Sequence, residues 1–257
     1  MKLGIIQGRL SVPDAGHQTT PFDWRKEFTL IDKMNLCHIE WNVDNKRLDS
    51  NPIFHEDISK ITEKISSVCF DNLVTSDFYN YSFFKSAFVD FLSRLCEQGI
   101  YKLTIPLLEE SKLDSLERVH KATDFISKAL DIDDRIQITV ESDGPLDYIK
   151  PVINSSDRIF FTYDTGNLTA SNRKHDVYID ALFDKIKNIH LKDRKINQGP
   201  SVVLNGDVDF DQIFSILGGN GYEGIFTLQM ARGKPGSEKE QVLEYANRFR
   251  GLHEQYF

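Results

Sequence analysis

Residues 135–164 read RIQITVESDGPLDYIKPVINSSDRIFFTYD, and this stretch holds one complete strand–helix–strand unit. Its two ends, Arg135–Glu141 and Ile159–Asp164, are short and rich in β-branched and aromatic residues, as buried strands are. Between them, Pro145 follows Asp143 at a position suited to the first turn of a helix. Consecutive strands joined through a helix run parallel with a right-handed crossover, so this stretch predicts an α/β fold.

The same unit recurs along the whole chain. Six further apolar segments predict strands: Lys2–Gln7, His38–Val43, Ser66–Phe70, Lys102–Leu108, Ile186–Lys192 and Ile225–Met230. Helical spacing is found in Asp23–Met34, Phe84–Gln98 and Lys112–Leu130, and a capping-box pattern at Ser237–Glu240 opens a last helix. Eight such units in 257 residues, without a linker-like segment, favour a single (β/α)8 TIM barrel over residues 1–257.

Composition narrows the class of partner. The chain has 31 Lys and Arg against 39 Asp and Glu, a net charge of −8, which argues against nucleic acid because phosphate binding needs clustered cations. Its three cysteines lack metal-finger spacing, as expected of reduced thiols in the cytoplasm. There is no signal-peptide pattern and no apolar run approaching about 18 residues, so we expect a cytoplasmic protein without a membrane partner.

Polar residues alternate with apolar ones in the last four predicted strands. Side chains alternate between the two faces of a strand, and the apolar set should face the helices. The opposite set then points into the barrel and ends, on each strand, in a side chain able to bind a metal. These four residues are Glu141, Asp164, His190 and Gln229.

Four such residues on adjacent strands predict a divalent metal at the C-terminal end of the barrel, where active sites of this fold lie. One imidazole and several oxygen ligands suit Mn²⁺, Zn²⁺ or Co²⁺ better than a thiolate-bound ion, and Mg²⁺ stays open. Any one of these residues alone would more often be a hydrogen-bonded core residue. The joint pattern favours the metal site.

Five motifs carry a resemblance to a known family. They are IQGRL near the start, TVES at Glu141, YDTGN at Asp164, IHLKDR at His190, and GYEGIFTLQMARG around Gln229. In these motifs the chain resembles the xylose isomerase-like TIM-barrel superfamily of sugar and sugar phosphate isomerases and epimerases. The DTGN and HLKD motifs are most similar to L-xylulose-5-phosphate 3-epimerase, whose barrel resembles tagatose 3-epimerase.

The resemblance implies a metal held by Glu141, Asp164, His190 and a fourth residue that is Glu in the family and Gln229 here. It also implies a metal-stabilised enediolate, with Glu141 moving the proton if burial raises its pKa. Gln229 is neutral and cannot act as a base. One-base aldose–ketose isomerisation therefore stays open, whereas two-base epimerisation would need a substitute such as Glu40 or Asp193, and strand parity turns Asp193 outward.

Several residues near the predicted mouth are candidates for binding a small sugar or sugar phosphate. Asn167, three residues after Asp164, is assigned to a substrate hydroxyl. Three cations could bind an anion. Lys192 ends the seventh predicted strand and Arg232 follows the eighth, where barrel phosphate sites lie, and Arg9 follows the first strand at the same face. Solvated surface charge is the alternative. The other histidines outside the strands, His175 among them, are expected to be exposed.

Two other functions stay open, and a third is disfavoured. A lyase or dehydratase would use the same enediolate but expel a hydroxyl. A catalytically silent sugar-binding barrel would explain Gln229. A DNA-repair endonuclease of the same superfamily would need more histidine ligands and a basic face, neither of which this chain shows. Barrels of this kind often pair, so a homodimer is a further expectation.

Overall fold

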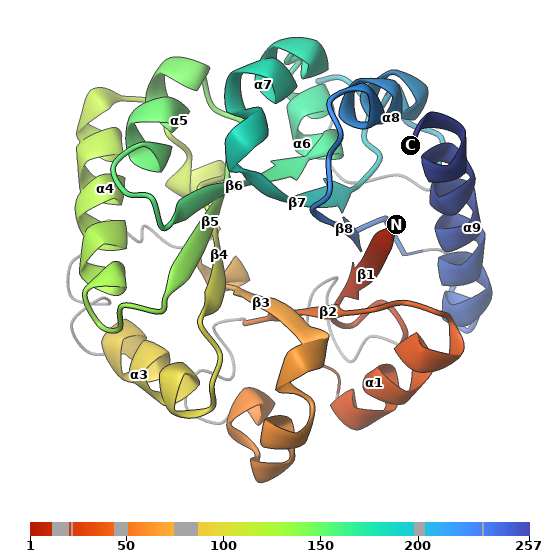
Figure 1. Cartoon of the computed structure of the whole chain (residues 1–257), viewed down its shortest axis with the longest axis horizontal. Helices are drawn as coiled ribbons and strands as arrows, with labels where there is room; N and C mark the ends of the chain where they lie inside the picture. Colours follow the sequence, from red (N-terminus) through yellow and green to blue (C-terminus); the bar gives the residue numbers. More distant parts are fainter. Residues whose placement is uncertain (12–20, 22, 44–50, 75–86, 198–203, 233) are drawn as a thin grey trace.

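The computed structural model describes residues 1–11, 21, 23–43, 51–74, 87–197, 204–232 and 234–257. Parallel strands β1 to β8 close into a barrel in chain order, as Figure 1 shows. Their bounds are β1 Lys2–Ile6, β2 Ile39–Asn42, β3 Ile65–Cys69, β4 Lys102–Pro106, β5 Gln137–Glu141, β6 Ile159–Asp164, β7 Ile186–Leu191 and β8 Ile225–Leu228. The predicted (β/α)8 barrel is therefore confirmed, and each strand lies within two residues of its predicted bounds.

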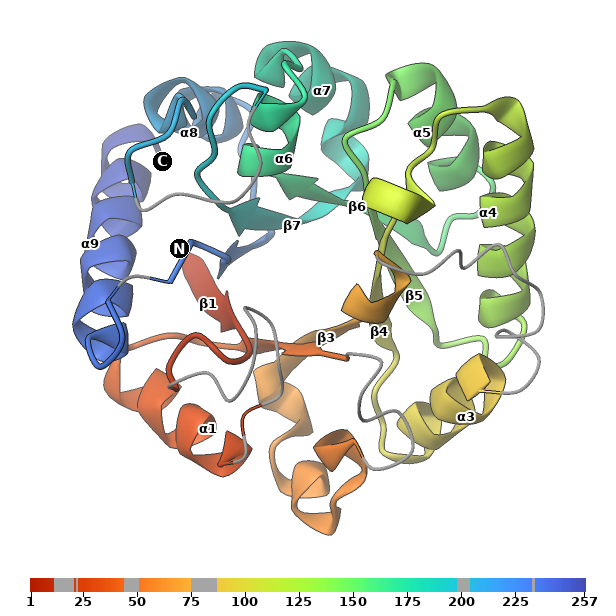
Figure 2. The same cartoon turned by 180° about the vertical axis from the view of Figure 1, so that it is seen from behind.

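Helices surround the strands, and the reverse view in Figure 2 shows the same outer ring. Their bounds are α1 Trp24–Lys33, α3 Val89–Glu97, α4 Leu116–Leu130, α5 Leu146–Ile153, α6 Thr165–Ala170, α7 His175–Leu182, α8 Phe210–Gly219 and α9 Glu238–Tyr256. Short 3-10 helices add η1 Pro52–Phe54, η2 Glu56–Lys60, η3 Thr62–Lys64, η4 Asp71–Leu73, η6 Glu109–Ser111 and η7 Phe183–Lys185. The described part of the β2–β3 crossover thus consists of 3-10 helices η1 to η3.

One predicted helix start and one predicted helix cap need correction. Helix α4 begins at Leu116 instead of Lys112, because Ser115 accepts from Arg118 N at 3.3 Å and caps the helix. At α9 the start is correct but the capping box is not, since Ser237 Oγ donates to Lys234 O at 2.6 Å. Residues 84–86 of the predicted third helix lie outside the described residues.

The outward faces of the strands form the main core with the helices. Ile138, Val140, Phe161, Ile189 and Phe226 are at most 1% exposed, as their alternation predicts. Aromatic rings fill the space between β8 and helices α8 and α9, where the Phe214 ring stacks on both Phe226 and Phe249. Burial of this layer fixes the register of the strands, because a one-residue slip would turn the apolar set inward.

The barrel interior is polar and hydrogen-bonded. Hydroxyl groups of Ser67, Thr104 and Thr139 form a row across β3, β4 and β5, with oxygen–oxygen distances of 3.0 and 3.1 Å. On the other side, His38 Nε2 lies 3.0 Å from Thr227 Oγ1. A Cβ at Gly4 would lie 2.2 Å from the His38 ring, so glycine at this position makes room for the imidazole. Small polar residues therefore fill the barrel interior below the C-terminal ends of the strands.

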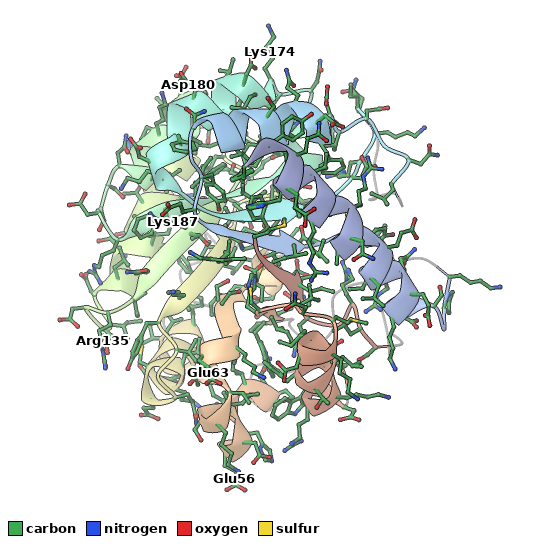
Figure 3. The ribbon with its side chains drawn as sticks, turned by 45° about the vertical axis from the view of Figure 1, so that its right-hand side comes forward. Glu56, Glu63, Arg135, Lys174, Asp180 and Lys187 are labelled. Atoms are coloured by element: carbon green, nitrogen blue, oxygen red, sulfur yellow. The ribbon has the colours of Figure 1, made fainter. Side chains whose placement is uncertain are left out.

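Charged side chains of both signs cover the outside. Figure 3 shows Glu56, Lys174 and Asp180 projecting away from the ring, and all three are exposed. Within the described residues, no helix is long and apolar enough to cross a membrane.

Candidate metal centre

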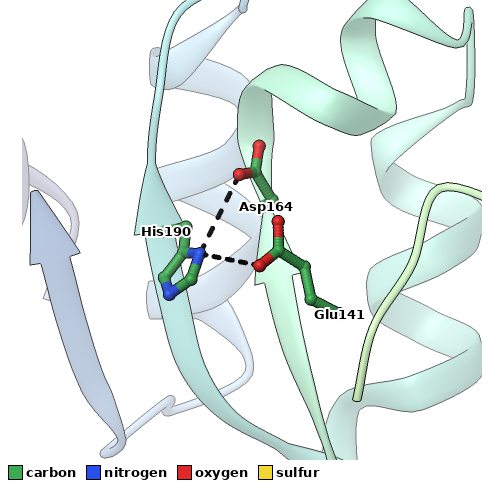
Figure 4. Close-up of side chains that lie close together, drawn as sticks. All are labelled: Glu141, Asp164 and His190. Atoms are coloured by element: carbon green, nitrogen blue, oxygen red, sulfur yellow. Dashed lines mark ion pairs between the residues drawn. The ribbon is translucent and has the colours of Figure 1, made fainter. Parts of the chain in front are cut away.

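Three buried side chains converge at the C-terminal ends of neighbouring strands. Glu141, Asp164 and His190 end or nearly end β5, β6 and β7, and one potential ligand atom from each lies within 4.8 Å of the others. Figure 4 shows both carboxylates turned toward the same ring nitrogen of His190. This nitrogen, Nδ1, lies 3.3 Å from Glu141 Oε2 and 3.9 Å from Asp164 Oδ2.

The two carboxylate oxygens of Asp164 have different roles: one caps a helix, and the other faces the cluster. Its side chain caps α6, with Oδ1 accepting from Asn167 N at 2.6 Å. The other oxygen, Oδ2, is buried and makes no hydrogen bond within the described residues, although Lys192 Nζ lies 3.5 Å away. The cap fixes the carboxylate so that Oδ2 faces the cluster.

Glu141 is held in the same way. Asn167 Nδ2 donates to Glu141 Oε1 at 2.8 Å, which leaves Oε2 on the side of His190. Arg194 NH1 in turn donates to Asn167 Oδ1 at 2.8 Å. Asn167 therefore positions Glu141 in this structure, and its predicted contact with a substrate hydroxyl stays a prediction.

The second ring nitrogen of His190 points away from the cluster. Its Nε2 lies 2.6 Å from Glu40 Oε2, and both side chains are fully buried. Nδ1, like Asp164 Oδ2, is buried without a hydrogen bond among the described residues. Each of the three residues thus has one anchored atom and another that faces the cluster.

Gln229 follows β8 and continues its pairing with β7, because Gln229 N donates to Leu191 O at 3.0 Å. Strand alternation places its side chain on the inward face with Thr227. The side-chain oxygen Oε1 is buried, and no described residue donates a hydrogen bond to it. Sequence parity predicted this inward position.

The charges of the cluster shift its pKa values in opposite directions. Burial alone would lower the pKa of His190, but the charges of Glu40 and Glu141 outweigh it and raise this pKa well above its usual value. Burial favours neutral Glu141 as well, yet His190 and then Lys192 lower its pKa overall. The condition set from the sequence, that burial raises the pKa of Glu141 overall, is therefore not met. Burial does raise the pKa of Asp164.

The predicted anion-binding cations divide into two kinds. Lys192 directs its ammonium group to Asp164, inside the site. Arg9 Nε donates to Met230 O at 3.0 Å, and Arg232 donates to the carbonyls of Ser11 and Gly8. These two guanidinium groups join the loops after β1 and β8, so a substrate contact for them stays a prediction.

Two acidic residues extend the site beyond the predicted set. Glu40 is open from the sequence to two roles, a substitute base or a structural hydrogen bond, and in the structure its Oε2 lies 2.6 Å from His190 Nε2. Asp71 was missed, although it lies two residues after β3, a position that signals the mouth of a barrel. Burial raises its pKa to about 6, and the charges of Lys192, Glu141 and Arg9 act on it. Asp193 is buried away from the cluster and accepts from Gly206 N at 2.8 Å.

The donor set fits a divalent ion. Asp164 Oδ2, His190 Nδ1 and Gln229 Oε1 come from the ends of three neighbouring strands, and each is a buried polar atom without a hydrogen bond among the described residues. A buried unsatisfied polar atom is costly, so Asp164 Oδ2 and His190 Nδ1, which lie 3.9 Å apart, indicate a missing partner. Two carboxylates, an imidazole and an amide oxygen suit a borderline or hard cation.

Fold and site together define a (β/α)8 barrel with a candidate metal centre at its C-terminal end. Residues 145–250 match the profile of the xylose isomerase-like TIM barrel family, which confirms the resemblance predicted from the motifs.

Solved structures share the fold over nearly the whole chain. The IOLI protein with a bound zinc atom has a TM-score of 0.76 at 17% identity, covering 100% of this chain and 99% of that one. D-psicose 3-epimerase with D-tagatose, from Clostridium cellulolyticum H10, has a TM-score of 0.69 at 14% identity, covering 98% and 99%.

One curated relative matches part of the sequence. The inosose dehydratase of Clostridium tetani (strain Massachusetts / E88) is 30% identical over 133 residues. This match spans 43% of the present chain and 41% of the dehydratase.

Proposed function

We propose that this protein is a divalent-metal-dependent isomerase or epimerase that moves a proton beside the carbonyl of a sugar or sugar phosphate. The observation that carries the proposal is the set of buried polar atoms without hydrogen bonds among the described residues at Asp164, His190 and Gln229. The zinc atom named with the IOLI structure and the sugar named with the epimerase structure support a metal and a sugar as its ligands.

Glu141, Asp164, His190 and Gln229 would hold the ion. When bound, a divalent ion supplies Lewis acidity that stabilises negative charge on the substrate oxygen as the proton leaves. Glu141 accepts that proton, and its lowered pKa keeps it in the ionised form that a base needs at neutral pH. Asn167 holds the carboxylate through Oε1.

Lys192 adds a positive charge at the edge of the site. Its ammonium group lies 3.5 Å from Asp164 Oδ2, the oxygen assigned to the metal. A cation here orients an oxygen-rich substrate and favours one that carries a phosphate. The four ligand positions and Lys192 therefore support a polyhydroxylated, preferably phosphorylated, carbonyl compound.

The metal content of the purified protein tests the site. Elemental mass spectrometry should find about one Mn, Zn, Co or Mg per chain in the wild type, and little in His190→Ala or Gln229→Ala. Asp193→Asn is the matched control, because this buried carboxylate binds the backbone of Gly206 and Val208 outside the cluster. A metal-free wild type that also binds no added divalent ion would contradict the proposal.

Proton transfer is tested with the metal-loaded protein in D₂O. Ketoses, aldoses and their phosphates should take up deuterium at the carbon next to the carbonyl. If the protein binds metal and sugar but exchanges no proton with any of them, it is the silent binding barrel.

A second candidate function, dehydration, is favoured by Asp71. Gln229 cannot serve as a second acid or base, whereas Asp71 is a carboxyl group at the same face with a pKa of about 6. A partly protonated carboxyl near neutral pH can protonate a leaving hydroxyl. The partial similarity to an inosose dehydratase points the same way. Loss of one water from a substrate such as an inosose, followed by mass spectrometry, separates dehydration from isomerisation.

A further inference from the structure

Glu40 makes a contact that crosses the barrel. It lies on β2, whereas His190 lies on β7, and these strands are not neighbours in the closed sheet. Even so, Glu40 Oε2 and His190 Nε2 are 2.6 Å apart, and neither side chain is exposed to solvent. The contact therefore runs through the interior of the barrel, directly beneath the candidate metal centre.

Both oxygens of Glu40 are in use. While Oε2 faces His190, Oε1 accepts from Ser67 Oγ at 2.7 Å and from Thr104 Oγ1 at 2.5 Å. These hydroxyls come from β3 and β4 and belong to the row that continues to Thr139. A carboxylate held by three donors cannot turn toward a substrate, so Glu40 is unsuited to replace the missing base.

This arrangement determines which nitrogen of His190 is available. An ionised carboxylate only accepts hydrogen bonds, so the imidazole must carry its hydrogen on Nε2. In the neutral ring the lone pair is then on Nδ1, the atom that lies 3.3 Å from Glu141 Oε2 and 3.9 Å from Asp164 Oδ2. The ring is thus oriented before any ligand arrives, and a metal that displaces the Nδ1 proton meets the lone pair on the nitrogen that faces the cluster.

We propose that Glu40 is a positioning residue that fixes His190 as an Nδ1 metal ligand and supplies, from behind the ring, the negative charge that Gln229 does not. This role rests on the proposed metal site. A carboxylate that accepts from a metal-binding imidazole makes the ring a stronger donor, and loss of such a partner typically weakens metal affinity by about 10- to 100-fold. Because Gln229 is neutral, only two of the proposed ligands, Glu141 and Asp164, are carboxylates. Glu40 adds a third carboxylate, which contacts the ligand His190 and not the metal.

The test is Co²⁺ binding to wild type and Glu40→Gln, followed through the visible absorption of the ion and by competition with a chelator. Glu40→Gln keeps an oxygen acceptor of the same shape but removes the charge. We expect its Co²⁺ affinity to fall by about 10- to 100-fold, with a changed Co²⁺ spectrum.

Glu27→Gln is the matched control. Glu27 is 1% exposed and, like Glu40, accepts three hydrogen bonds, from Gly8 N, Leu10 N and Ser11 Oγ, but it does not contact His190. Its substitution should change the melting temperature of the metal-free protein while leaving Co²⁺ affinity and spectrum as in the wild type.

A milder variant, Thr104→Val, tests the same role if Glu40→Gln does not fold. It removes one hydroxyl from Glu40 and keeps the charge, so Co²⁺ affinity should fall by only a few-fold. Unchanged affinity and spectrum in both Glu40→Gln and Thr104→Val would overturn the role of Glu40 while leaving the metal site intact. A wild type that binds no Co²⁺ would overturn the metal site itself, and this role with it.

Discussion

The two halves of the barrel contribute different chemistry to one site. Strands β5 to β7 carry Glu141, Asp164 and His190, whose ligand atoms lie within 4.8 Å of one another, and Gln229 follows β8 with a buried side-chain oxygen. Among the described residues, the first half instead contributes Glu40, which lies 2.6 Å from His190, and Asp71, on whose pKa the charge of Lys192 acts. The match to the family profile, residues 145–250, also lies in the second half. The candidate ligands thus come from the second half. The first half contributes Glu40, which contacts the ligand His190, and Asp71 as a possible second acid.

The largest effect is expected in the second half, from Glu141→Gln. Loss of the proton-accepting group should lower kcat by about 10²- to 10⁴-fold, because general base catalysis contributes that much. Glu110→Gln, an exposed change at the same end of the barrel, should leave kcat unchanged. The measurement is turnover of the best substrate at saturating metal. A Glu141→Gln enzyme within a few-fold of the wild type would mean that another group takes the proton.

Two buried histidines, one in each half, should make the free energy of unfolding fall at acidic pH. Burial lowers the pKa of both His38 and His175 to about 4. The unfolded chain binds these protons near pH 6.5, so the stabilisation is complete above that pH and is lost as the pH falls toward 4. Each histidine should account for a loss of about 3 kcal/mol by pH 4.

Urea unfolding of the metal-free protein at pH 7 and pH 5 measures this loss. His175→Gln and His38→Gln should each show a smaller decrease between these two conditions than the wild type. Decreases equal to that of the wild type would show that neither imidazole is the group that takes up the proton.

Asp71→Asn tests the acid in the first half. If Asp71 donates a proton, the wild-type rate should fall as the pH rises through about 6, since the protonated form is then lost. The variant should be slower and lack this limb of the pH profile, with metal affinity unchanged. A variant that keeps the same limb would assign it to another group.

The smallest effect is expected from Gln229→Glu. A charged fourth ligand should strengthen metal binding by roughly tenfold, because affinity increases with the charge of the ligand set. Chelator competition measures the change, and the same substitution in Glu40→Gln shows whether the two charges replace each other. Weaker binding in Gln229→Glu would mean that Gln229 does not reach the metal.

The sequence alone predicted the features that depend on the spacing of apolar residues along the chain. The eight strands and the inward direction of Glu141, Asp164, His190 and Gln229 follow from alternation and hydrophobic spacing, which act locally. Contacts between distant strands could not be predicted in this way. Glu40 meets His190 only because the barrel closes, and His175 is buried instead of exposed because it lies against Tyr163 and Thr169. The direction of the Glu141 pKa shift likewise depends on the charges assembled around it.

The guanidinium groups of Arg9 and Arg232 have a consequence for how the chain reaches this structure. They join the loops after β1 and β8, and Arg9 and Met230 are 221 residues apart in sequence. Bringing such distant segments together costs about 5 kcal/mol of chain entropy, and contacts of long sequence separation slow folding. The last step of folding is therefore expected to be the joining of the first and last strands, completed by side chains from both ends of the chain.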